Sequence, residues 1–317
     1  MSSEVLSLSD VQRARQRIAS CVRRTPLVPS MTLSERLKTN VYVKLELFQK
    51  TGSFKVRGVF NKALSLAPEI HAKGLVTVSG GNNALAVAYA SRALDLPGTV
   101  LMPDNTPQPI QDATRNYGAT VKFASTAAEA FSQAAELERD GCIYIHPFDD
   151  PVLMAGQGTM ALEILDDVPQ VTDIVLSIGG GGMMVGVGTV IKALKPSVRI
   201  WGVETQGADS MAQSLAAGRI VTLEAMTSIA RSLGALSPSE RTFAMAQQFL
   251  ESVTVVSDKD AIDSARFLLD RLKVLAEPAA SCTYAGAARL QGQFTAGKHV
   301  VLLLSGGNVG LDALLPG

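Results

Sequence analysis

The chain has 317 residues, 47% of them hydrophobic and 18% charged, and its 29 basic residues balance its 29 acidic residues. A chain of this length can bury a large core and stands near the size at which one core divides into two lobes. A formal net charge of zero favours neither a nucleic-acid nor an anionic-membrane partner, and no apolar run approaches the roughly 18 residues of a membrane span. We therefore expect a cytoplasmic protein that binds a small molecule.

The N-terminal sequence MSSEVLSLSDVQRARQRIAS predicts an amphipathic, charged helix rather than a signal peptide. The three cysteines, Cys21, Cys142 and Cys282, lie far apart in apolar surroundings and lack the spacing of metal ligands. We interpret them as reduced thiols in the core, which agrees with a cytoplasmic location.

Short runs rich in β-branched residues alternate with helical patterns along the rest of the chain. This alternation is typical of an α/β fold with buried, mainly parallel strands joined by helices. The expected strands lie in 41–47, 75–79, 99–103, 119–124, 142–147, 173–180, 199–205, 253–258 and 299–307. No repeat or linker divides the chain, so we expect two domains formed by insertion of one α/β unit into another. Ligands of such folds bind at the strand-to-helix turns.

The stretch KTGSFKVRG, residues 50–58, places Lys55 in the first turn of an expected helix, after a small and flexible turn. The positive end of the helix dipole disfavours a cation there, and a dry site would lower the lysine pKa further. A neutral amine could then attack a carbonyl group and form a Schiff base. From these nine residues alone, a solvated lysine is the more common case.

Two other turns combine glycine with serine and asparagine. In SGGNNA, residues 79–84, a helix is expected to begin near Asn82. Its backbone N–H groups and the Ser79 hydroxyl could bind a carboxylate, although a simple helix cap is more common. In SGGN, residues 305–308, Ser305 ends a fully buried strand. Its hydroxyl needs a partner there, and a heterocyclic nitrogen would serve.

The run from Gly179 to Gly182 closes one expected strand and opens the helix MMVGVGTVIKALK. Without Cβ atoms, backbone N–H groups can converge on an anion at the positive end of the helix, so we interpret the run as a phosphate-binding cup. Two alternatives are a plain tight turn and a dinucleotide-binding fingerprint. The fingerprint needs an acidic residue about 20 positions further on to bind the ribose, and Glu204 stands there.

Together these turns resemble those of the fold type II pyridoxal-phosphate (PLP) enzymes, in the serine/threonine dehydratase and serine racemase group. The similar stretches are LFQKTGSFKVRG, VSGGNNALAVAYA, GGGGMMVGVGTVIKALKPSVRIWGVE, EPAAS and SGGN, and they span nearly the whole chain. The resemblance implies two open, twisted, mainly parallel sheets flanked by helices, as in the tryptophan synthase β subunit. A small domain, residues 74–149, would be inserted into a large PLP-binding domain, residues 1–73 and 150–317, and would close over the cofactor.

The resemblance also implies roles for single residues. Lys55 would be the catalytic residue and would bind PLP as a Schiff base. The other cofactor-binding residues would be Phe54 beside the lysine, Asn82 on the 3'-oxygen, Gly179, Gly180, Gly181, Gly182 and Met183 on the phosphate, Glu277 near the ring, and Ser305 on the pyridine nitrogen. The substrate carboxylate would bind at Ser79, Gly80, Asn82 and Asn83.

The sequence departs from the family pattern at three places. Asn83 replaces a histidine of the carboxylate loop, and Gly80 replaces the second serine of racemases, which leaves no proton donor for the opposite face of Cα. A weak cation site is expected at Glu204, Ala208 and Ser210, where the serine replaces an aspartate and removes one hard anionic ligand. Glu204 could instead be a surface acid at the end of a strand.

The resemblance implies PLP-dependent β-elimination, in which a β-hydroxy amino acid such as L-threonine or L-serine gives a 2-keto acid and ammonia. A serine at position 305 favours prompt elimination. Its hydroxyl need not keep the pyridine nitrogen protonated, so the ring is a weaker electron sink and stabilises a long-lived carbanion less. The alternatives are a racemase, a β-replacement enzyme such as cysteine synthase, a 3-hydroxyaspartate or phenylserine dehydratase, and a binding protein without catalysis. We also expect a homodimer or higher homo-oligomer and, because the chain ends soon after SGGN, no appended regulatory domain.

Overall fold

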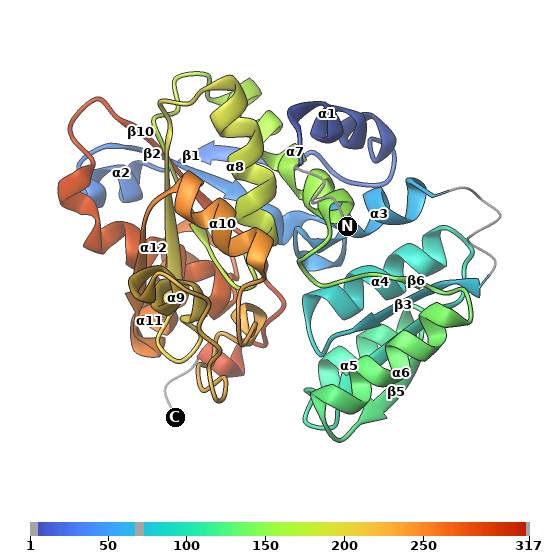
Figure 1. The fold of residues 1–317 in the computed structure, drawn as a ribbon. Helices are drawn as coiled ribbons and strands as arrows, with labels where there is room; N and C mark the ends of the chain where they lie inside the picture. The colour runs from blue at the N-terminus through green and yellow to red at the C-terminus, as the bar shows by residue number, and fades with distance from the viewer. Residues whose placement is uncertain (1–5, 67–72, 315–317) are drawn as a thin grey trace.

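The strands of the computed structural model, which describes residues 6–66 and 73–314, form two sheets (Figure 1). The larger sheet has the order β1-β2-β10-β7-β8-β9 and the smaller one the order β5-β4-β3-β6. Every pairing is parallel except that of β1 with β2. The strands are Leu27–Pro29 (β1), Asn40–Leu45 (β2), Leu75–Val78 (β3), Gly98–Pro103 (β4), Thr120–Ala124 (β5), Ile143–Tyr144 (β6), Asp173–Ser177 (β7), Arg199–Thr205 (β8), Leu250–Val256 (β9) and His299–Leu304 (β10).

All nine expected strands are confirmed, and so is the α/β fold with mainly parallel sheets. Strand β1, an edge strand of three residues that ends in proline, was not predicted. So short a run shows no periodicity, and proline is tolerated at a sheet edge because the neighbouring strand is absent on one side.

Helices cover both faces of each sheet (Figure 1). They are Leu8–Arg17 (α1), Met31–Leu37 (α2), Lys55–Leu64 (α3), Asn82–Ala93 (α4), Gln108–Asn116 (α5), Ala127–Arg139 (α6), Pro151–Asp167 (α7), Gly182–Leu194 (α8), Ser210–Ala217 (α9), Glu240–Phe249 (α10), Asp258–Leu272 (α11) and Pro278–Arg289 (α12). Short 3₁₀ turns lie at Glu46–Phe48, Lys50–Gly52, Arg231–Leu233, Gln291–Gln293 and Asp312–Leu314. In the described ranges, no helix is both long enough and apolar enough to span a membrane.

Strand β10 shows how the larger sheet divides the core. Val300, Leu302 and Leu304 pack with α2, α11 and α12 on one face, whereas Val301 and Leu303 pack with α1, α7 and α8 on the other. Successive side chains of a strand point to opposite faces, so a strand that is covered on both faces is apolar throughout. This packing explains the uninterrupted apolar sequence HVVLLL.

The smaller sheet comes entirely from residues 75–144 and has α6 on one face and α4 with α5 on the other. Helix α3 precedes this segment in the chain, yet it packs against both α4 and α7 (Figure 1). Its side chains Val56 and Phe60 belong to the same apolar cluster as Leu75 and Ile143. The division of the chain at residues 73 and 149 stays a prediction.

The expected N-terminal helix is confirmed as α1, which begins after Ser7. A capping box fixes this start, because the Ser7 side chain accepts from the Asp10 N–H while the Asp10 carboxylate accepts from the Ser7 N–H. Residues 1–5 of the predicted helix lie outside the described residues. The prediction of core thiols is correct for Cys282 but wrong for Cys21 and Cys142, which are half-buried beside apolar clusters; all three are free.

Candidate active site

The start of α3 places Lys55 beside the end of β10. Ser53 pairs with Gly306 in an isolated antiparallel bridge, and the Phe54 N–H donates to the Ser305 carbonyl oxygen at 3.1 Å. The preceding turn is tight because Gly52 has φ +73°, a conformation that suits glycine. These contacts bring two predicted site residues, Lys55 and Ser305, together across 250 positions of the chain.

Lys55 is half-buried and lines a pocket. Burial lowers the pKa of Lys55 to about 8, and the Glu277 carboxylate only partly opposes this effect. The amine donates to the Pro147 carbonyl oxygen at 2.5 Å. The interpretation of Lys55 as a solvated surface lysine is therefore wrong, and a neutral amine is accessible near physiological pH.

The glycine run follows β7 and leads into α8, as predicted. Gly181 has φ +90° and is the N-cap of α8, with no side chain bonded to the first turn. The N–H groups of that first turn have no intrahelical acceptors and remain available to an anion. A Cβ atom on Gly180 or Gly182 would overlap Phe148, and one on Gly179 would lie 3.0 Å from the Cα of Leu233. Glycine is thus required both by the left-handed turn and by close packing.

Asn82 and Glu277 connect the start of α4 to the start of α12. The Asn82 side-chain nitrogen donates to Glu277 Oε1 at 2.7 Å, and the Asn82 oxygen accepts from Asn308 Nδ2 at 2.7 Å. Ser232 Oγ lies 3.2 Å from the other Glu277 oxygen. Burial raises the pKa of Glu277 to about 7, although the hydrogen bonds from Asn82 and Ser232 act in the opposite direction.

Ser305 follows β10 and is 5% exposed. Its hydroxyl has one partner in the described structure, Ser177 Oγ at 3.5 Å. Because a hydroxyl can donate one hydrogen bond and accept two, and this contact is at the limit of hydrogen-bond length, Ser305 can bind a further polar atom.

These groups line one pocket. The predicted cofactor-binding residues in its lining are Phe54, Lys55, Asn82, Gly179, Gly180, Gly181, Gly182, Met183, Glu277 and Ser305. The other residues of the lining are Phe148, Gln157, Ser177, Met184, Ser232, Leu233 and Ala279. The stretches PFDD, residues 147–150, and TSIARSLGA, residues 227–235, were candidates for the pocket wall, and Phe148, Ser232 and Leu233 come from them. Gln157 lies in an ordinary helical pattern, so only spatial proximity identifies it.

Three residues of the predicted carboxylate loop are not part of this lining. Asn83 is buried and donates to Thr77 Oγ1 of β3 at 2.9 Å, so its amide is directed toward the smaller sheet. The Ser79 hydroxyl accepts from the Gly81 N–H at 3.2 Å. A Cβ atom on Gly80 would lie 2.6 Å from Thr106 Oγ1, so a side chain at Gly80 would displace Thr106. Their contact with a substrate carboxylate stays a prediction.

Glu204 is fully buried, which makes the interpretation of Glu204 as a surface acid wrong. Its carboxylate accepts from the Met211 and Ala212 N–H groups at 3.1 and 2.8 Å, and so caps α9. A dinucleotide-binding site needs an acidic group that is free to bind the ribose, and both Glu204 oxygens already accept from α9, so the dinucleotide interpretation is disfavoured. Ser210 Oγ donates to the Ala235 carbonyl oxygen at 3.1 Å. The described ranges contain no cluster of three or more metal-ligating side chains of His, Cys, Asp or Glu, and the cation site stays a prediction.

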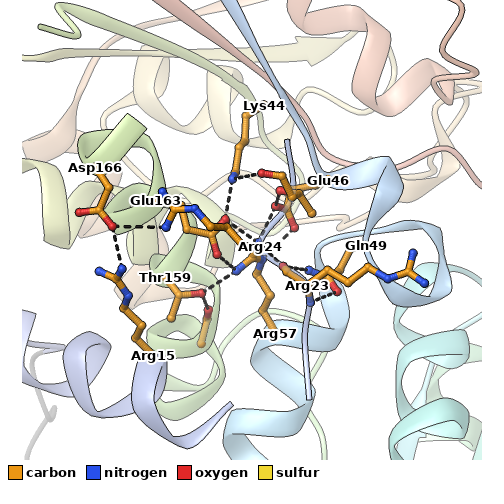
Figure 2. Close-up of polar contacts among 12 residues, drawn as sticks. Arg15, Arg23, Arg24, Lys44, Glu46, Gln49, Arg57, Thr159, Glu163 and Asp166 are labelled. Atoms are coloured by element: carbon orange, nitrogen blue, oxygen red, sulfur yellow. Dashed lines mark hydrogen bonds and ion pairs between the residues drawn. The ribbon is translucent and has the colours of Figure 1, made fainter. Parts of the chain in front are cut away.

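A buried ionic network supports the helix that carries Lys55 (Figure 2). Arg57, two residues further along α3, is fully buried and forms paired hydrogen bonds of 2.7–3.0 Å with both Glu46 and Glu163. Lys44 donates to Glu163 Oε2 at 2.5 Å. Burial alone would lower the pKa of Arg57, but the two carboxylates raise it. The network ties α3 to β2 and α7 and was not predicted.

Comparisons with known proteins agree with this geometry. Residues 18–306 match the family described as pyridoxal-phosphate dependent enzyme. The chain is 36% identical over 312 residues to the L-threonine ammonia-lyase of Thermotoga maritima, covering 98% of this chain and 77% of that protein. It is similar to the structure of the processed threonine deaminase isoform 2 from Solanum lycopersicum, with a TM-score of 0.91, 34% identity, and 97% and 85% of the two chains covered. It is also similar to maize serine racemase, with a TM-score of 0.93, 32% identity, and 98% and 96% covered.

Proposed function

The chain belongs to the family of pyridoxal-phosphate-dependent enzymes, and on this premise we propose that it is an ammonia-lyase for β-hydroxy amino acids such as L-threonine or L-serine. The products would be a 2-keto acid and ammonia. The observation that carries this proposal is the position of the half-buried Lys55 amine in one pocket with the glycine run and the Ser305 hydroxyl.

The residues of the pocket fit the cofactor of the family. The uncapped first turn of α8 after Gly181 offers N–H groups for the phosphate, and Lys55 offers the amine for the aldehyde. Ser305 has hydrogen-bonding capacity left for the pyridine nitrogen. Asn82 and Glu277 are hydrogen-bonded to each other, so they would present one fixed polar surface beside the pyridine ring of PLP.

When bound, PLP supplies an electron sink that acidifies the substrate Cα proton. Lys55 Nζ, once released, would accept that proton, because its lowered pKa keeps part of the amine neutral near pH 8. The Pro147 carbonyl oxygen would hold the released amine inside the pocket, since it already accepts from Nζ. Glu277, buried beside Asn82, would exclude water and keep the polar contacts of the site fixed.

Elimination is favoured over racemisation for two reasons. Ser305 is uncharged, so it does not enforce a protonated pyridine nitrogen, and a long-lived carbanion is less stabilised. Gly80 has no side chain, and the nearby Thr106 hydroxyl is engaged with the Pro103 carbonyl oxygen at 2.7 Å. The carboxylate loop would therefore lack the acid needed to return a proton to the opposite face of Cα.

Incubation of the holoenzyme with L-threonine and with L-serine in deuterated water tests this proposal. We expect keto acid from at least one of them, with little deuterated D-isomer, because an absent or misplaced general acid typically slows proton delivery about 100-fold or more. Chiral chromatography measures both products. D-isomer formed as fast as keto acid would support a racemase, and no keto acid from these or from 3-hydroxyaspartate and phenylserine would contradict the lyase proposal.

Replacement of Ser305 by alanine tests the assignment of the pyridine nitrogen. We expect Ser305→Ala to weaken elimination by about 1–3 kcal/mol, because a buried polar atom of the cofactor would lose its partner. Turnover and cofactor affinity should be measured together. The matched control is Ser177→Ala, which removes the neighbouring hydroxyl and should have the smaller effect. Unchanged turnover and affinity in Ser305→Ala would exclude this role.

The enzyme acts on a small amino-acid substrate. A homodimer or higher homo-oligomer remains a proposal that rests on the family resemblance, and a cytoplasmic location remains a proposal that rests on the three free cysteines. Size-exclusion chromatography with light scattering would test the oligomeric state.

A further inference from the structure

Gln157, in the middle of α7, is a buried polar side chain without partners at the wall of the pocket. It is 1% exposed, and neither atom of its amide group has a hydrogen-bond partner within the described residues. Buried polar side chains in native proteins are nearly always satisfied by protein, solvent or ligand. The amide group of Gln157 therefore indicates a contact with something that occupies the pocket.

Gln157 lies where α7 packs closely against two other helices. A Cβ atom on Gly58 of α3 would lie 3.1 Å from the Gln157 side-chain nitrogen. On the α8 side, a Cβ atom on Gly158 would lie 2.7 Å from the Gly186 carbonyl oxygen. Helix α8 begins one turn before Gly186, and its first residues share the pocket lining with Gln157. The amide nitrogen thus lies beside α3, and Gln157 lines the same pocket as the glycine run and the first residues of α8.

The charges in the pocket also favour an amide contact with phosphate. The charged side chains of the described lining are Lys55 and Glu277, and Lys55 is the amine that binds the aldehyde. No arginine or second lysine is present in this lining to neutralise a phosphate. Backbone N–H groups and a neutral side-chain donor would then supply the hydrogen bonds, and bonds to charged acceptors are the stronger kind.

We propose that the Gln157 side-chain nitrogen donates a hydrogen bond to the phosphate of PLP and is a cofactor-binding residue in addition to the glycine run. The proposal rests on the cofactor of the family and not on the reaction. Its failure is therefore distinguishable from failure of the lyase proposal, because cofactor affinity and keto-acid formation are measured separately.

The test compares PLP with pyridoxal, which carries the same aldehyde and ring but no phosphate. Apoenzyme of the native chain and of Gln157→Met is titrated with each compound, and binding is followed by absorbance. Methionine has a similar length and no donor. We expect PLP affinity to fall roughly 10- to 150-fold in Gln157→Met, because the phosphate would lose one hydrogen bond to a charged group. Pyridoxal affinity should stay unchanged. The ³¹P resonance of bound PLP should also shift in the variant.

Unchanged PLP affinity, or an equal loss for PLP and pyridoxal, would overturn the proposal. Circular dichroism of each apoenzyme checks that the variant is folded. If Gln157→Met does not fold, Gln157→Glu decides the question, because a carboxylate of the same length repels phosphate. That variant should weaken PLP more than pyridoxal, and equal effects on both compounds would reject the contact.

Discussion

Lys55→Ala is expected to abolish keto-acid formation while the protein remains folded. Loss of a general base alone typically costs 10²- to 10⁴-fold, and Lys55 would also be the covalent anchor of the cofactor, so we expect a fall of at least about 10⁴-fold. The glycine run should still bind the phosphate, which predicts some retained PLP without the yellow colour of the native enzyme. Turnover and absorbance spectra measure these effects.

The matched control is Lys50→Ala in the same stretch. The Lys50 amine lies over the Tyr89 ring, 5.9 Å from its centroid, and Lys50 does not line the pocket. Activity and colour should persist in this variant. In the native holoenzyme, borohydride reduction should attach the cofactor to Lys55, as peptide mapping would show. Attachment to another lysine, or turnover of Lys55→Ala within tenfold of native, would contradict the assignment.

Arg57→Leu is expected to destabilise the fold by about 3–5 kcal/mol, because it leaves buried carboxylates without their main partner. Glu46 and Glu163 would retain only Lys44 as a cation in this network. Since Arg57 is two residues from Lys55 on α3, the change should also shift the absorbance of bound cofactor. Urea denaturation measures the free energy of unfolding.

Two variants control for this effect. Arg15→Leu removes the exposed ion pair with Asp166 and should cost less than about 1 kcal/mol, as surface pairs do. The double variant with Glu46→Leu added to Arg57→Leu should recover part of the loss, because apolar residues often replace a buried ion pair at little cost. An Arg57→Leu protein as stable as the native chain would show that the network does not stabilise α3.

Much of the site could be predicted from the sequence because its signals are local. The apolar run before Ser305 and the position of Lys55 at the start of a helix depend on residues a few positions away. The left-handed φ of Gly181 belongs to a run of four glycines that is visible in the sequence. Such patterns express the preferences of the backbone, which hold before any distant segment packs.

Only the tertiary structure decided which polar groups are buried together. Asn82 and Glu277 bond across 195 positions, and Arg57 and Glu163 across 106. Gln157 lies in an ordinary helical pattern. The position of Glu204 at the end of a strand was also compatible with an exposed acid, yet the residue is buried. Burial and partners of such groups depend on how α3, α7 and α8 pack against the sheets. That packing is set by contacts between segments far apart in the chain, which local preferences do not specify.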